Sequence, residues 1–253
     1  MRDGKVAVVK RLPWAGLLAL AALGTTAQGA PPDDAQSAAR QELVAVLRVK
    51  PDPDHGAQLF AICTGCHGSQ GSGMPSGWVP DIAGQHPHVI AKQLVDYRHG
   101  QRWDDRMEKV AGGGHVLKTT QDIADVVGYI GALMPALATS VGNGQWTQEG
   151  HDVYERLCRS CHGAAAEGSN VRSIPRLASQ HYEYLLRQLH DSIEGRRPSM
   201  AGKHQTLSHL GMQELVGLAD YLSRLTPPAS QRDERTASIG RSRGPAIVEL
   251  LTR

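Results

Sequence analysis

Two short segments of the chain each place a pair of cysteines directly before a histidine. They read Cys63-Thr64-Gly65-Cys66-His67 and Cys158-Arg159-Ser160-Cys161-His162. The pattern Cys-x-x-Cys-His is the signal for covalent attachment of c-type haem. The two thiols add to the vinyl groups of the porphyrin, and the imidazole on the same helical turn binds the iron. The motifs therefore predict two haem c groups, attached through Cys63, Cys66, Cys158 and Cys161, with His67 and His162 as iron ligands.

A zinc site and a redox-active dithiol are the alternatives for such cysteine pairs. A structural zinc site would need two pairs that converge on one metal, whereas each pair here has its own histidine. A thioredoxin-type pair needs a strand–helix context, which the surrounding pattern lacks. All four cysteines belong to the two motifs, so none is left for a separate disulfide. These observations favour haem.

The two motifs belong to a longer internal repeat with an offset of 95 residues. The same offset relates a Pro, an Ala, a Gln-His pair, a Gln-Leu pair, an Asp, a Gly and an Arg in the first copy, at positions 80, 83, 85–86, 93–94, 96, 100 and 102. Beyond these residues the offset shortens to 93 between Met107 and Met200. We therefore expect two tandem copies of one unit.

The sixth iron ligand decides between electron transfer and chemistry at the iron. Met107 and Met200 occupy matching places after the same Gly-x-Arg turn, and we predict that they are these ligands. The alternative for a single methionine is core packing, which we expect of Met74, Met134 and Met212.

Histidine is the rival ligand type, since bis-histidine ligation is also possible. His86 and His181 match across the repeat. Each opens the second helix of its copy, where a polar cap or a contact near the haem edge is favoured. His115 and His204 are out of register, and we expect them to be solvated loop residues.

Two further pairs fall in register around these ligands. Pro80 and Pro175 each follow the proximal histidine by 13 residues, and a carbonyl there is suited to accept the ring N–H. A plain rigid turn is the alternative. Arg102 and Arg197 are candidates to pair with haem propionates, or are solvated residues at a helix end.

Each copy shows a helical pattern with no competing strand pattern, so the predicted fold class is all-α. Asp54 and Thr147 are candidate caps for the helix that runs into each cysteine pair. A second helix starts near Pro87 or His181 and stops at a glycine. A third starts near Thr120, with a counterpart that carries leucines in the second copy.

The chain has 253 residues, of which 40% are apolar and 21% charged, and its net charge of +2 excludes a polycationic nucleic-acid binder as the default. Only one Phe, four Trp and six Tyr are present, so a large apolar cofactor is needed to fill two cores. The basic start, apolar run and small residues of 1–30 predict a secretory signal peptide, and without it the charge is −1. The predicted segments are the signal peptide 1–30, a linker with room for a short helix 31–53, domain one 54–135, a linker 136–146, domain two 147–226 and a mobile tail 227–253.

Taken together, the chain resembles the di-haem cytochrome c4 type over about residues 54–226. The resemblance lies in the two Cys-x-x-Cys-His motifs and in elements near Pro-Asp-Ile-Ala-Gly-Gln-His (80–86), Pro-Arg-Leu-Ala-Ser-Gln-His (175–181), Lys-Gln-Leu (92–94), Arg-Gln-Leu (187–189), Tyr129 and Tyr221. It implies two tandem class I cytochrome c folds related by a pseudo-two-fold axis. The chain departs from the pattern at Asp81 and Arg176, where a small polar residue is common, and at Ser179, where glycine is usual.

The resemblance also implies a function. It is periplasmic electron transfer from a quinol-oxidising complex or dehydrogenase to a terminal oxidase or reductase, with redox proteins as partners and possible peripheral membrane association. A haem subunit dedicated to a larger complex is the first alternative. A di-haem enzyme such as a thiosulfate dehydrogenase or peroxidase is the second, and it is disfavoured because no spare cysteine is left to ligate a working iron. Docking is expected to depend on local charge patches and on salt.

Overall fold

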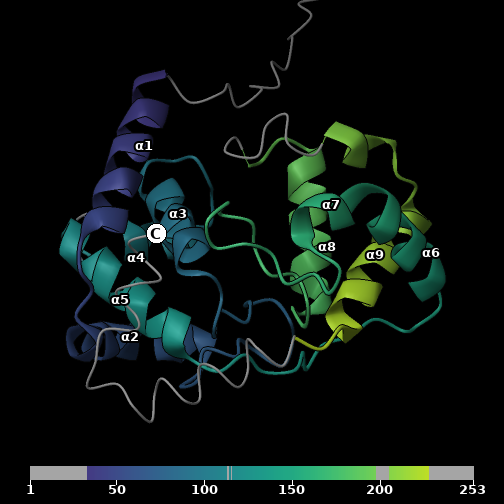
Figure 1. Ribbon diagram of the computed structural model, residues 1–253, viewed down its shortest axis with the longest axis horizontal. Helices are drawn as coiled ribbons and strands as arrows, with labels where there is room; N and C mark the ends of the chain where they lie inside the picture. Colours follow the sequence, from purple (N-terminus) through teal and green to yellow (C-terminus); the bar gives the residue numbers. More distant parts are fainter. Residues whose placement is uncertain (1–32, 113, 115, 198–204, 228–253) are drawn as a thin grey trace, which may run out of the picture. The chain divides into compact units, whose positions relative to one another are not determined.

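The computed structural model describes residues 33–112, 114, 116–197 and 205–227, and these belong to one unit that begins at Pro31 (Figure 1). The predicted signal peptide, nearly all of the predicted tail, His115, Met200 and His204 lie outside the described residues.

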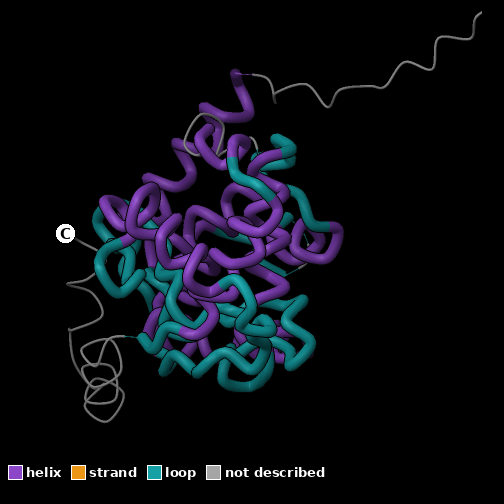
Figure 2. Tube along the Cα trace, turned by 90° about the vertical axis from the view of Figure 1, so that its right-hand side faces the viewer, coloured by secondary structure: helices purple, strands orange, loops and turns teal. Residues whose placement is uncertain are grey.

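Helices form the described part of both copies, and no strand occurs there beyond one isolated bridge between Ser169 and Ile174 (Figure 2). The helices up to the middle of the chain are α1 (Asp33–Arg48), α2 (Pro53–His67), α3 (Pro87–Arg98), α4 (Asp105–Ala111) and α5 (Thr120–Ala132). Those that follow are α6 (Thr147–Val153), a π-helical turn (Tyr154–Cys158), α7 (Arg159–His162), α8 (Tyr182–Ile193), a 3-10 turn (Gln205–His209) and α9 (Met212–Arg224). The all-α prediction is confirmed.

The starts of the two motif helices differ from the expected ones. Asp52, not Asp54, caps α2, because its carboxylate accepts the N–H groups of Asp54 at 2.9 Å and His55 at 3.1 Å. Pro53 then takes the first helical position, where a missing N–H costs nothing. In the second copy no side chain caps α6, and the Thr147 hydroxyl donates instead to the Gly144 carbonyl. Both predicted caps are therefore wrong.

In each copy the helix that leads into the cysteine motif crosses the last helix very closely. A Cβ on Gly56 of α2 would lie 2.2 Å from the Asp125 carbonyl of α5. In the second copy a Cβ on Gly150 would lie 2.0 Å from the Gly217 carbonyl of α9. Both distances are far below van der Waals contact, so each crossing requires glycine. The glycines thus fix the helices that lead into the two haem-attachment motifs.

The segment predicted as a linker holds a full helix of 16 residues, α1. Its apolar residues recur at three- and four-residue spacing and face α3 and α5, with Ala39 and Val46 buried and Leu43 and Leu47 partly buried. The prolines that flank this segment suggested a linker, whereas they only bound the helix. The first copy therefore carries an additional helix before its haem motif.

The turn before the second helix has the same left-handed backbone in both copies. Gly84 and Ser179 each have φ of 61°. Their N–H groups donate to Ile130 at 3.0 Å and to Leu222 at 3.1 Å, near the end of the last helix of each copy. A serine in this conformation costs about 1–2 kcal/mol, which the bond from the Ala138 N–H to its hydroxyl partly offsets.

Candidate functional site

His67 ends α2 and points its ring into a cavity. Its side chain is buried, and Nδ1 donates to the Pro80 carbonyl at 3.1 Å. Burial lowers the pKa of His67, which favours the neutral imidazole. With Nδ1 occupied by a carbonyl, the lone pair of Nε2 is free to bind a metal.

His162 of α7 has the same environment in the second copy. It is buried to the same degree, and its Nδ1 donates to the Pro175 carbonyl, also at 3.1 Å. The predicted contact from a proline carbonyl is therefore present in both copies. It gives both rings the orientation that an iron ligand needs.

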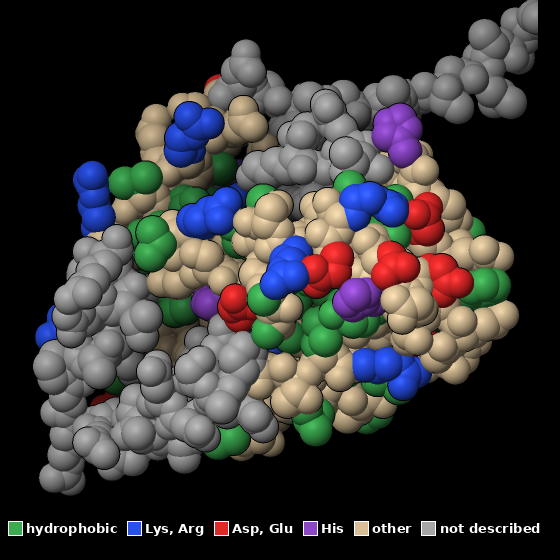
Figure 3. Space-filling view, turned by 45° about the vertical axis from the view of Figure 1, so that its right-hand side comes forward, with side chains coloured by type: hydrophobic (Ala, Val, Ile, Leu, Met, Phe, Trp, Pro, Cys, Tyr) green, Lys and Arg blue, Asp and Glu red, His purple; other side chains and the backbone are tan. Residues whose placement is uncertain are grey.

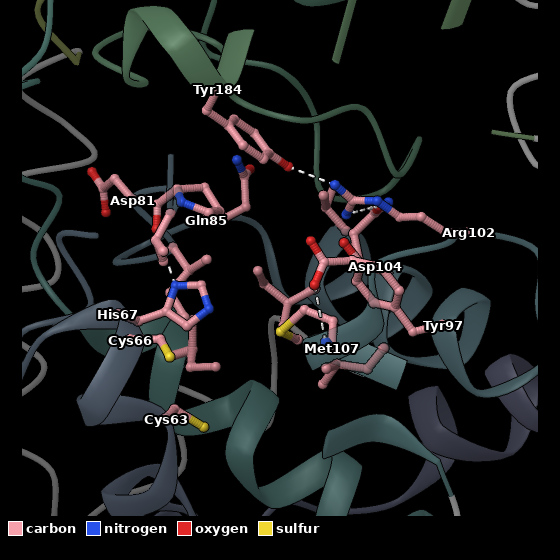
Figure 4. Close-up of a pocket in the computed structure, with 18 of the residues that line it drawn as sticks. Cys63, Cys66, His67, Asp81, Gln85, Tyr97, Arg102, Asp104, Met107 and Tyr184 are labelled. Carbon is pink, nitrogen blue, oxygen red and sulfur yellow. Dashed lines mark hydrogen bonds between the residues drawn. The ribbon is translucent and has the colours of Figure 1, made fainter. Parts of the chain in front are cut away.

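Met107 lies across the cavity from His67. Figure 4 shows the methionine sulfur and the His67 ring facing one another over the open space. Met107 comes from α4, a short helix that the sequence analysis missed. Asp104 caps this helix by accepting the Met107 N–H at 3.2 Å and the Arg106 N–H at 3.1 Å. An aspartate just before a helix-forming segment was the signal that could have found it.

The cavity between these two residues is lined mainly by apolar side chains from α3, α5 and the loops. They include Val89, Ile90, Leu94, Leu117, Val126 and Ile130. Cys63 and Cys66 lie on the same side of the cavity as His67 (Figure 4). An apolar cavity with two thiols and a histidine on one side and a thioether on the other fits a covalently attached haem.

Two of the four thiols, one in each copy, are partly buried. Burial raises the pKa of both Cys63 and Cys158 to about 11. Each cysteine pair stands beside its own histidine in its own copy, which does not suit a zinc site shared between two pairs. Within the described ranges, no three His, Cys, Asp or Glu side chains group so as to hold a metal ion.

Arg102 lies buried at the edge of the cavity and reaches the other copy. Its guanidinium donates to Gln93 at 2.6 Å, to the Tyr184 hydroxyl at 2.8 Å and to Gln188 at 2.7 Å. Arg197 donates to Gln93 at 3.1 Å, and burial lowers its pKa to about 10. The predicted alternative of a solvated helix end is therefore wrong for Arg102.

Neither Arg102 nor Arg197 forms an ion pair with a carboxylate of the described residues, and the Arg197 Nε is buried without a hydrogen-bond partner among them. Buried cations need anionic partners, and a guanidinium suits a carboxylate. Haem propionates would supply such carboxylates. The edge of the cavity therefore also fits haem.

The two copies meet through a reciprocal pair of glutamines. Gln85 accepts the Arg176 N–H at 2.9 Å and donates to the Arg176 carbonyl at 3.0 Å. Gln180 accepts the Asp81 N–H at 3.0 Å and donates to the Asp81 carbonyl at 2.8 Å. Arg176 and Asp81 each follow the proline whose carbonyl contacts the motif histidine of their own copy. Each glutamine therefore binds the equivalent residue of the other copy, so a pseudo-two-fold axis relates the two copies.

His86 and His181 also bind across this interface. The His86 Nε2 contacts the Glu167 carbonyl and the His181 Nε2 contacts the Ser72 carbonyl, both at 2.8 Å. Both residues stand at the cap position of a helix, but neither forms a side-chain cap there. The expected cap is therefore wrong, and rings held by the other copy's backbone disfavour bis-histidine ligation.

Asp81 and Arg176 form a buried ion pair at the same interface. The Arg176 Nη2 lies 3.5 Å from the Asp81 Oδ2, and both side chains are 2% exposed. The guanidinium also donates to the Ala178 carbonyl at 2.9 Å and the Ala83 carbonyl at 3.1 Å. Two of the three departures from the family pattern noted in the sequence, Asp81 and Arg176, are therefore partners of one another.

Core packing was predicted for three other methionines. Met134 and Met212 are 48% and 67% exposed, so the prediction is wrong for both, and Met74 is only partly buried. Met134 follows the end of α5, and Met212 is the first residue of α9.

The comparisons with known proteins cover both copies. Residues 53–133 match the family model described as cytochrome c, and residues 145–222 match the model described as cytochrome c oxidase, cbb3-type, subunit III. Cytochrome c4 of Thiocapsa roseopersicina is 31% identical over 189 residues, which cover 69% of this chain and 93% of that protein. The chain belongs to the cytochrome c4 family. Like the members of this family, it is a di-haem electron-transfer cytochrome with two covalently bound haem c groups, and its partners are redox proteins.

Two further similarities concern the fold and a named role. The reduced cytochrome c4 of Pseudomonas stutzeri has the same fold, with a TM-score of 0.62 at 22% identity over 70% of this chain and 100% of that one. The thiosulfate dehydrogenase electron acceptor of Stutzerimonas stutzeri is 27% identical over 64% of this chain and 78% of that protein. In the part of this cytochrome that the structure describes, no helix is long and apolar enough to span a bilayer.

Proposed function

We propose that this cytochrome is a periplasmic electron carrier whose iron ligands are His67 and Met107 in the first domain and His162 and Met200 in the second. The observation that carries the proposal is the His67 ring and the Met107 sulfur facing one another across an apolar cavity. The matching contact of His162 with Pro175 and the register of Met200 with Met107 extend it to the second domain.

Haem in this ligand set supplies a one-electron couple of high potential, because a thioether ligand raises the potential. The protein holds both ligands on helices that are fixed at their ends. The Pro80 carbonyl fixes the His67 ring, and Asp104 caps the helix of Met107. Fixed ligands allow the electron to arrive and leave with little movement, which suits a carrier.

The position of the cavity supports electron passage between the two haems. Second-domain residues line the first-domain cavity, among them Tyr184, Arg187 and Gln188. The edge where Arg102 and Arg197 share Gln93 therefore faces both domains. Reduced partners would load one haem and oxidised partners would empty the other.

We place the carrier between a quinol-oxidising complex or a dehydrogenase and a terminal oxidase or reductase. The name of the Stutzerimonas stutzeri relative supports a dehydrogenase as one possible donor class. On the face shown in Figure 3, basic and acidic side chains are interspersed among apolar ones. Such a surface favours docking through local patches that salt screens.

The carrier proposal is tested by measuring reduction and reoxidation of the haems with redox partners present and with the protein alone. The purified holoprotein should be reduced by a quinol-oxidising complex with quinol, and reoxidised by a terminal oxidase with oxygen. Alone, it should not oxidise thiosulfate or reduce hydrogen peroxide at a catalytic rate. Catalysis by the protein alone would overturn the carrier proposal in favour of an enzyme. Isolation only as part of a complex would favour a dedicated haem subunit.

A further inference from the structure

Helix α1 brings an acidic residue against the end of α3. The Glu42 carboxylate pairs with the Arg98 guanidinium through one oxygen and contacts the His99 Nε2 at 2.6 Å through the other. The side chains of Glu42 and Arg98 are 16% and 11% exposed. We call Glu42, Arg98 and His99 the α1 charge cluster. Removing one partner of a pair this well shielded from water costs more than removing one partner of a surface salt bridge.

Arg98 uses its other donors on the chain around the Met107 helix. Its Nε donates to the Ala111 carbonyl at 2.7 Å, and its Nη2 donates to the Leu117 carbonyl at 2.5 Å. Ala111 is the last residue of α4, and Leu117 precedes α5 and lines the haem cavity. One guanidinium therefore joins the two ends of the connection between α4 and α5.

Glu42 is what keeps Arg98 in this place. A guanidinium that is largely shielded from water needs a counter-charge, and Glu42 is the carboxylate that pairs with it. Without that charge the arginine gains by turning toward solvent, which releases the two carbonyls. The end of α4 would then be free to move, and Met107 lies one helical turn before it.

The second domain lacks this arrangement. At the repeat offset of 95, Arg98 and His99 correspond to Ile193 and Glu194. The structure describes all of residues 133–146, and they contain no helix that would match α1. Family matching also begins only at residue 53, after α1. The cluster is therefore a property of the first haem site of this chain.

We propose that the α1 charge cluster is a positioning device for the sixth ligand of the first haem: Glu42 holds Arg98, which holds the α4 end and thereby Met107 over the iron. Glu42 and Arg98 are positioning residues, since neither lines the cavity between His67 and Met107. The inference rests on the proposed assignment of Met107 as an iron ligand.

The test uses imidazole, which competes with a methionine for oxidised haem iron. Imidazole is added to the oxidised holoprotein while the methionine–iron charge-transfer band is followed. The haem methyl signals in the proton NMR spectrum follow the two haems separately. For Glu42→Gln, the imidazole concentration that displaces half of the methionine at the first haem should fall about tenfold, as expected for the loss of a charged hydrogen bond. The second haem should keep its wild-type value.

Two variants separate positioning from general stability. Arg98→Lys keeps the charge near Glu42 but cannot bind both carbonyls, so it should also weaken the first haem only. Arg40→Gln changes an exposed residue of the same helix and should change neither haem. Equal shifts at both haems, or no shift in Glu42→Gln, would overturn the proposal.

The ligand assignment has its own control. Met107→Ala should abolish the charge-transfer band of the first haem before any imidazole is added. If that band persists, Met107 is not the ligand, and the ligand assignment fails together with the positioning role. If the band is lost in Met107→Ala but Glu42→Gln behaves as wild type, only the positioning role fails.

Discussion

The buried pair of Asp81 and Arg176 gives a sharp prediction about how the two domains are held together. Replacing Arg176 by methionine removes an ion pair at 3.5 Å and the two hydrogen bonds to the Ala83 and Ala178 carbonyls. It leaves a carboxylate that is 2% exposed without its counter-charge. Breaking one side of a buried pair costs about 3–5 kcal/mol, and we expect the free energy of unfolding of Arg176→Met to fall by that amount.

Guanidinium unfolding of the oxidised holoprotein measures this loss, with tryptophan fluorescence and haem absorbance as the two signals. Adding Asp81→Asn to Arg176→Met should restore part of the lost stability, because it removes the unpaired charge. Lys109→Met breaks an exposed pair with Asp105 and should cost less than about 1 kcal/mol. A loss below about 1 kcal/mol in Arg176→Met, or a further loss on adding Asp81→Asn, would refute the reasoning.

The same variant should show a pH dependence of known sign. Burial raises the pKa of Asp81 in the folded protein, and Arg176 opposes this rise. Without the guanidinium the folded-state pKa rises further, so the folded state prefers the protonated acid. Between the unfolded and the folded pKa, stability then falls as the pH rises. Above the folded-state pKa of Asp81 in the wild type, only the variant continues to lose stability. The stability gap between Arg176→Met and the wild type should therefore be larger at about pH 7 than at about pH 4, and an equal gap at both pH values would contradict the assignment.

Three further predictions concern the helix crossings, the interface and the surface. Gly56→Ala and Gly150→Ala should each lower the free energy of unfolding by about 1–3 kcal/mol, because the new Cβ meets a backbone carbonyl. A midpoint of guanidinium unfolding equal to the wild-type value would contradict the close crossing. Gln85→Ala and Gln180→Ala each leave a backbone N–H and C=O of the other copy unpaired, which should lower the free energy of unfolding by about 1–3 kcal/mol. The two losses should be similar because the two contacts mirror one another, and calorimetry of both variants checks this. The second-order rate constant of reduction by a partner complex should change as sodium chloride rises from 10 to 200 mM in stopped flow, and a constant rate would speak against docking through charge patches.

The parts of this protein that follow from residue spacing could be predicted from the sequence. The carbonyl contacts of Pro80 and Pro175 lie within one copy at a fixed distance from the histidine, so the repeat itself pointed to them. The all-α class followed from the helical period in the same way. These features depend on local geometry, which the chain carries in its own pattern.

Contacts between distant segments could not be predicted in this way. Asp81 and Arg176 are mirrored positions, and only the meeting of the two copies near their pseudo-two-fold axis makes them partners. His86 and His181 were expected to serve their own helices, whereas each binds the backbone of the other copy. The segment 31–53 was expected to be a linker with room for a short helix, whereas α1 is 16 residues long and is stabilised by packing against α3 and α5.

The most direct test of the account is an optical redox titration of the purified holoprotein that includes the weak methionine-to-iron charge-transfer band. The account predicts two low-spin haems, both with positive potentials, and a band intensity that corresponds to two methionine-ligated irons. A high-spin component, or a low-potential haem without the band, would contradict the assignment of Met107 or Met200 and with it the role of a simple electron carrier.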